Sequence, residues 1–205
     1  IAALAMADAA PELAQSTLEA ALRSLPRAMA EFGPDGGWIE GPGYWGYTAE
    51  YTVYFLAALE SAIGPEAIAP FLRTPGFDTT GDFALQTCGP IGKIFNFADS
   101  HPGAGREPQL FWLARKFGRP EYAWYAARHF PRAATPRDML WYSADQKSPI
   151  EAGLPLDRYF RHTETVLMRS AWEDASAVFV GFKGGDNLAN HGHLDLGSFV
   201  LDADG

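Results

Sequence analysis

The spacing of apolar residues changes near residue 150, and this change limits the folds that the chain can adopt. Before it, apolar side chains recur at helical spacing in several segments, which Gly/Pro-rich loops separate. After about Asp157, the segments are short and rich in β-branched and apolar residues, which is typical of strands. The sequence therefore predicts a mainly α fold with a β part, with a boundary at 145–160 that divides residues 1–150 from residues 151–205.

Five segments have the apolar spacing of helices, at 11–31, 48–63, 66–72, 108–117 and 120–130. Pro11 suits the first turn of the first segment, whereas Pro26 is expected to kink or interrupt it. Successive helices with no strands between them pack as antiparallel pairs, which favours a bundle, a solenoid or a helical toroid. No strict repeat period is visible in the sequence, so the pattern does not choose among the three.

Three strands are expected in the β part, at 163–170, 176–183 and 197–202, with residues 172–175 as a hairpin loop. Three strands are too few for an independent domain. The first residues have the pattern of a helix already in progress. We therefore expect the chain to be a fragment cut at both ends, an (α/α) arrangement followed by the first strands of an antiparallel sheet.

Charge and cysteine content exclude some functions. The formal net charge is -9 and the sequence pI is about 4.9, which argues against a nucleic-acid-binding surface, because phosphate contacts need clustered Lys and Arg. No run of about 18 apolar residues is present, so no membrane span is predicted. Cys88 is the single cysteine, which excludes an intrachain disulfide and a zinc site built on several thiolates. The redox compartment stays undetermined.

The stretch GDNLANHGHLDLGSF at 185–199 concentrates groups that carry chemistry. If the backbone is extended at Gly192, then His191, His193 and Asp195 project from one face of a strand. Such a face offers proton-transfer groups and metal ligands together, as in a metal-dependent enzyme with a His-x-His-x-Asp ligand set. The alternative is a turn whose Asn and His side chains only satisfy local backbone groups.

A second informative stretch, DGGWIEGPGYWGYT at 35–48, places five glycines and a proline around tyrosines, tryptophans and a glutamate. It is predicted as a loop that forms a pocket wall, because glycine lets a ligand approach the backbone. The phenols of Tyr44 and Tyr47 could donate a proton to a leaving oxygen or, once ionised, take one from carbon. The alternative is a rigid turn between helices with tyrosines that are merely hydrogen-bonded.

Weaker signals lie between these stretches. Asn96 and Asp99 belong to a predicted pocket-edge loop, although an Asx turn explains that loop nearly as well. Arg169, at a predicted strand end, is the most suggestive of several cations near the β part. Solvated charges at strand ends are the alternative for Arg158, Arg161 and Lys183.

Taken in order, three motifs resemble the heparinase II/III-like polysaccharide lyases: DGGWIEGPGYWGY at 35–47, VLMRSAW at 166–172 and NHGHLDLGSF at 190–199. The resemblance covers nearly the whole chain, and the last motif is the most specific. It implies a helical (α/α) toroid joined to an antiparallel β-sandwich, with the active site between them. It also implies missing parts: an amide-bearing motif before Ile1, and two further zinc ligands after Gly205.

What the resemblance implies is β-elimination on a uronic-acid-containing polysaccharide or oligosaccharide. Such an enzyme removes the C5 proton and expels the oxygen at C4, once the neighbouring carboxylate has been neutralised. By motif, Tyr44 matches the acid–base phenol, with Tyr47 as the second choice, and His191 matches the catalytic histidine. His193 matches a ligand of a structural zinc. The expected substrate-binding residues are Asn190, Glu40, Trp45, Asn96 and Arg169.

Two further functions stay open at this point. One is a non-catalytic carbohydrate-binding or structural module of the same fold, and the other is the metal-dependent enzyme described above. The expected partner in the leading hypothesis is an acidic polysaccharide, with no nucleic acid and no membrane span. Periplasmic or secreted localisation is somewhat favoured over cytoplasmic, because export is common for such lyases.

Overall fold

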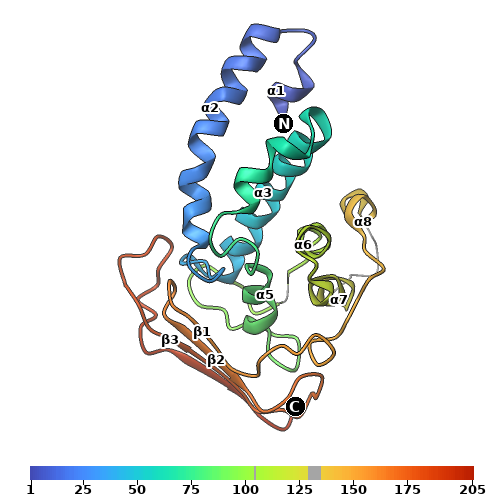
Figure 1. Ribbon diagram of the computed structural model, residues 1–205. Helices are drawn as coiled ribbons and strands as arrows, with labels where there is room; N and C mark the ends of the chain where they lie inside the picture. The colour runs from blue at the N-terminus through green and yellow to red at the C-terminus, as the bar shows by residue number, and fades with distance from the viewer. Residues whose placement is uncertain (104, 129–134) are drawn as a thin grey trace.

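A computed structural model describes residues 1–103, 105–128 and 135–205 (Figure 1). Among these residues, eight α-helices are followed by a four-stranded antiparallel sheet, and the helices with the short 3-10 segments make up 44% of the described residues. The predicted order of a helical part and then a β part is confirmed. The helical segments are α1 (Ala2–Ala5), α2 (Pro11–Met29), η1 (Ala30–Phe32), α3 (Gly41–Ile63), η2 (Pro65–Ala67), α4 (Ala69–Leu72), α5 (Gly81–Thr87), α6 (Gln109–Phe117), α7 (Pro120–Arg128) and α8 (Pro136–Trp141).

Helix α2 runs toward the sheet and α3 runs back away from it (Figure 1). The expected interruption at Pro26 is wrong, because α2 continues through this residue to Met29. Pro26 lies in the last turn, where its missing N–H removes only one helical hydrogen bond. A 3-10 turn, η1, then leads into one of the Gly/Pro-rich segments that separate the helices.

Helix α3 begins at Gly41 rather than at Thr48, so the second half of the predicted loop is helical. The glycines that suggested a loop are explained by close packing. A Cβ added at Gly46 would lie 2.7 Å from a carboxylate oxygen of Glu107, and one at Gly43 would lie 3.2 Å from Ser100 Oγ. Tertiary contacts thus override the low helix propensity of glycine.

Two short helices and one strand were not predicted. Every residue of α5 is buried, so the helix has no polar face to give an amphipathic pattern. Helix α8 has six residues and β1 has three, too few for a periodic signal. The predicted end of the helix at 120–130 lies outside the described residues.

The sheet is formed by β1 (Arg158–Phe160), β2 (Thr165–Arg169), β3 (Phe179–Lys183) and β4 (Phe199–Asp202), paired in chain order. In its register, Leu167 lies opposite Gly181, which lies opposite Val200. The change from helices to strands falls between residues 141 and 158. The inner face carries Phe160, Leu167 and Phe179, which are buried and share one core with the helices.

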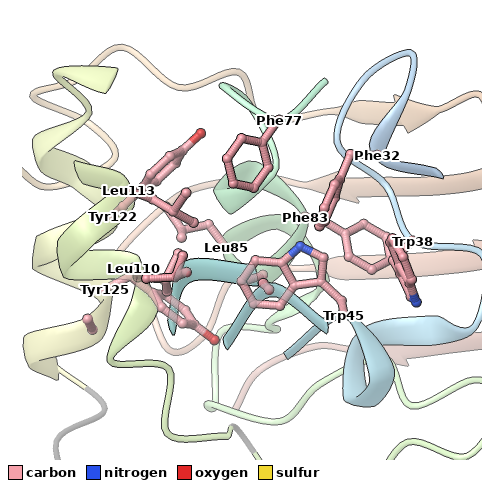
Figure 2. Close-up of a cluster of buried hydrophobic side chains, with 14 of the residues drawn as sticks. Phe32, Trp38, Trp45, Phe77, Phe83, Leu85, Leu110, Leu113, Tyr122 and Tyr125 are labelled. Carbon is pink, nitrogen blue, oxygen red and sulfur yellow. The ribbon is translucent and has the colours of Figure 1, made fainter. Parts of the chain in front are cut away.

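The centre of that core is aromatic (Figure 2). Trp45 is 1% exposed and donates from Nε1 to Thr80 Oγ1 over 2.8 Å. The phenyl ring of Phe32 contacts the rings of both Trp38 and Phe77. Among the described residues, no helix has the length and apolarity to cross a membrane.

Candidate functional site

The start of α3 meets the turn that precedes β4, and this contact brings two predicted site residues together. The rings of Tyr44 and His191 are stacked, with centroids 3.9 Å apart and planes inclined by 26°. Tyr44 lies in the first turns of α3, which point toward the sheet (Figure 1). The two residues come from the two most informative stretches of the sequence.

The histidine stretch forms turns and not the strand face considered above. His191 and Leu194 have φ angles of 57° and 60°, in the left-handed region that breaks an extended strand. Asp195 does not project beside the imidazoles as a third ligand. Its Oδ2 accepts hydrogen bonds from the backbone N–H of Ala98 at 2.9 Å and of His193 at 3.3 Å, so Asp195 holds the turn.

Both imidazoles bind the carboxylate of Asp99. Nδ1 of His191 lies 2.7 Å from Oδ2 of Asp99, and Nε2 of His193 lies 2.5 Å from Oδ1. The hydrogen bond to His191, followed by that to His193, lowers the pKa of Asp99 from its ordinary value. An ionised carboxylate can only accept, so both rings donate to it. In neutral His191 the unprotonated nitrogen is then Nε2, which has no hydrogen-bond partner among the described residues.

A buried cation lies beneath the turn. Lys183 is 5% exposed, and its Nζ donates to the carbonyl oxygen of Thr163 over 2.7 Å and to that of Gly184. The ammonium also lies 5.3 Å from the centre of the Phe97 ring. Burial lowers the pKa of Lys183 below its ordinary value.

The remaining predicted residues near this contact differ in exposure. Tyr47 is 60% exposed, with its ring centroid 6.4 Å from that of Tyr44. Asn190 and Asn96 are exposed, and the side chain of each is without a hydrogen-bond partner among the described residues. Glu40 is the N-cap residue of α3, and its Oε2 accepts a hydrogen bond from Trp38 Nε1 over 3.1 Å.

Two expected substrate-binding residues lie elsewhere. Trp45 belongs to the core, because successive helical residues point in different directions and Tyr44 takes the outward one. Arg169 is 8% exposed, and its Nη2 donates to the carbonyl oxygens of Gln86 at 2.7 Å and Cys88 at 3.2 Å. Its guanidinium stacks over Trp172 at 3.6 Å. Both side chains are buried and make structural contacts, and their role as substrate contacts stays a prediction.

The described residues do not by themselves make up a zinc site. No group of three or more His, Cys, Asp or Glu side chains among them could hold a metal ion. Nε2 of His193 is hydrogen-bonded to Asp99. Zinc at His193 therefore stays a prediction, and no chemical step is assigned to it here.

Asp99 and Ser100 are the residues that motif reading undervalued. The Oγ of Ser100 accepts a hydrogen bond from the N–H of Gly43 over 2.9 Å, which fixes the 96–100 loop against the start of α3. The signal available in the sequence was the polar pair Asn96 and Asp99 in that loop. Compared with known proteins, the chain matches no protein-family model and no curated protein.

Proposed function

We propose that the chain carries the acid–base centre of a lyase that cleaves a uronic-acid-containing polysaccharide by β-elimination. The observation that supports this proposal is the stacked pair of Tyr44 and His191, with Nδ1 of His191 held by Asp99. Proton transfer by a side chain requires a base that another group holds in the correct orientation, and Asp99 holds His191 in this way. Here a phenol and an imidazole are available side by side.

The reaction can be written with these two groups. Nε2 of His191 takes the proton from C5 of the uronate, and the electron pair of the C5–H bond forms a C4=C5 double bond. The C4–O bond breaks, and the leaving oxygen receives a proton from the hydroxyl of Tyr44. Asp99 keeps the imidazole in the tautomer that leaves Nε2 free to accept.

The C5 proton becomes acidic only if the neighbouring carboxylate is neutralised by donors. The exposed amide of Asn190 precedes His191 directly and is the donor that we assign to this carboxylate. The overall charge of -9 gives the substrate no long-range attraction. Recognition of the uronate must therefore depend on local hydrogen bonds.

The test is spectroscopic. The full-length protein would be incubated with heparan sulfate, alginate and hyaluronate while the ultraviolet absorbance of the new C4=C5 bond is followed. We expect Tyr44→Phe to lower turnover by about 100-fold or more, because it removes the proton donor and keeps the ring. Tyr159→Phe, a matched change of a tyrosine on β1, should leave turnover unchanged. Folded wild-type protein that yields no absorbance with any of these polymers would refute the proposal.

A carbohydrate-binding module is the second candidate, because two tyrosine rings of α3, those of Tyr47 and Tyr51, are exposed. Exposed aromatic rings can bind sugars without any acid–base chemistry. The same variant separates the two functions. A binding module keeps its affinity when Tyr44 is changed to Phe and gives no unsaturated product in either form, whereas the lyase loses turnover.

A further inference from the structure

The row of tyrosines that begins at Tyr44 continues along α3. Tyr44, Tyr47, Tyr51 and Tyr54 are spaced by three, four and three residues, so they lie on one face of the helix. Each ring contacts the next, with centroids 6.4, 4.7 and 5.8 Å apart. At 1.5 Å per residue, the row is about 15 Å long, which exceeds the length of a single sugar ring.

The middle of this tyrosine row is open to solvent. Tyr47 and Tyr51 are 60% and 56% exposed, although large aromatic side chains are usually well buried. A tyrosine ring has two flat faces and a hydroxyl group at its edge. The negative face of an aromatic ring attracts the polarised C–H groups of a sugar, while the hydroxyls suit its oxygens.

One end of the row is the stacked pair that carries the proposed chemistry. The ring of Tyr44 contacts His191 on one side and the ring of Tyr47 on the other. A polymer whose reacting sugar lies at His191 would therefore extend directly onto Tyr47 and Tyr51. The row is continuous with the proposed site and needs no rearrangement to join it.

The other end of the row opens into a cavity. The ring of Tyr54 contacts Trp141 on α8 at 5.4 Å, and its hydroxyl is held by Glu50 and Arg137. Beyond it lies a cavity of about 570 Å³, whose walls include Tyr54, Trp141, Trp112, Glu60, Arg115 and Lys116.

The charges of this cavity complement an anionic sugar. Lys116 is paired with Glu60, whereas Arg115 forms no ion pair within the part of the chain that the structure describes. A free guanidinium on the wall of a cavity can bind a carboxylate with two parallel hydrogen bonds. Cationic groups are thus present at the end of the row that lies away from His191.

We infer that the tyrosine row is a track that binds the sugars next to the reacting uronate, and that its far cavity receives an acidic sugar of the same chain. This inference rests on the proposed function, because the reacting sugar defines where the track begins. The row is one residue wide and carries hydroxyl groups, which suits a single polymer chain better than an apolar protein surface. The net charge of -9 disfavours a nucleic acid.

The experiment uses oligosaccharides of increasing length from heparan sulfate, alginate and hyaluronate. KM and kcat would be measured for the wild type, Tyr51→Ala, Tyr51→Phe and the control Tyr159→Ala. We expect wild-type KM to fall with length, and Tyr51→Ala to raise KM about tenfold for the longest substrates alone. Tyr51→Phe keeps the ring and should retain the wild-type dependence on length.

Other results would overturn the track or the lyase separately. If Tyr51→Ala keeps the wild-type dependence on length, the track is refuted while cleavage stands. If Tyr51→Ala changes only the molecular mass in gel filtration, the row is a self-association surface and the track is again refuted. If nothing is cleaved but calorimetry finds binding of long oligosaccharides that needs Tyr51, the lyase fails and the track is supported. Absence of both cleavage and binding refutes both.

Discussion

The inner face of the sheet buries two cations, Arg169 on β2 and Lys183 on β3. The register pairs Arg169 with Phe179 and Thr165 with Lys183, so the two cations lie at opposite ends of the same strand pair. Both donate to backbone carbonyl oxygens and lie over aromatic rings. Within the described residues, neither forms an ion pair with a carboxylate.

Their neighbours differ. Arg169 reaches the carbonyl oxygens at the end of α5, so it joins the helices to the sheet. Burial lowers its pKa to about 10, which leaves it charged at neutral pH. Lys183 donates to the carbonyl oxygens of Thr163, between β1 and β2, and of Gly184, directly after β3. It lies beneath the turn that carries His191 and His193, which we call the histidine turn. Each cation is the last residue of its strand. Because their hydrogen-bond partners differ, Arg169 stabilises the contact of the helices with the sheet, whereas Lys183 stabilises the region of the histidine turn.

The largest effect on stability should follow Arg169→Met. This change leaves the carbonyl oxygens of Gln86 and Cys88 without their donor, so the free energy of unfolding should fall by about 2–4 kcal/mol. Urea denaturation measures it. Arg73→Met, a matched change of an exposed arginine, should stay within about 0.5 kcal/mol of the wild type. A comparable turnover per folded molecule in Arg169→Met is also expected, and a selective loss of turnover would restore Arg169 to the site.

A smaller effect, on turnover alone, is expected for Asp99→Asn, which changes the carboxylate that binds His191 and His193. The amide no longer fixes the tautomer of His191, so turnover should fall roughly tenfold or more. The thermal midpoint should not change measurably, because the Asp99 side chain is partly exposed. Asp78→Asn is the matched control on another exposed aspartate. If Asp99→Asn unfolds the protein without any change in turnover per folded molecule, Asp99 is structural. The region of Lys183 and the histidine turn would then not differ in function from the region of Arg169.

The smallest effect should be the dependence of stability on pH that Lys183→Met removes. Burial lowers the pKa of Lys183 below its ordinary value of 10.5, so the unfolded chain binds more protons between the lowered pKa and 10.5. The stability of the wild type relative to Lys183→Met should therefore increase as the pH rises through this interval. Unfolding at several pH values, with Lys93→Met as control, measures it. A difference that does not vary with pH would show that Lys183 is not desolvated.

The sequence predicted the main elements of the fold and part of the site. Long helices such as α2 and the strands β2 and β3 carry clear periodic patterns, whereas α5 is buried on all sides and gives none. Tyr44 and His191 were assigned to one site by resemblance, and the structure places them in contact. Asp99 could not be assigned to His191 and His193, because only the tertiary fold brings its loop to theirs. The burial of Arg169 likewise depends on α5, which was not predicted.

The stack of Tyr44 on His191 also makes the site observable without any substrate. Protons that lie over the face of a phenol are shielded by its ring current, so the imidazole signals of His191 should appear upfield in a proton NMR spectrum. Undocking of the histidine turn from α3 would return them to the values of a free imidazole. The chemical shifts of the His191 imidazole therefore report whether the turn is packed against α3 in solution.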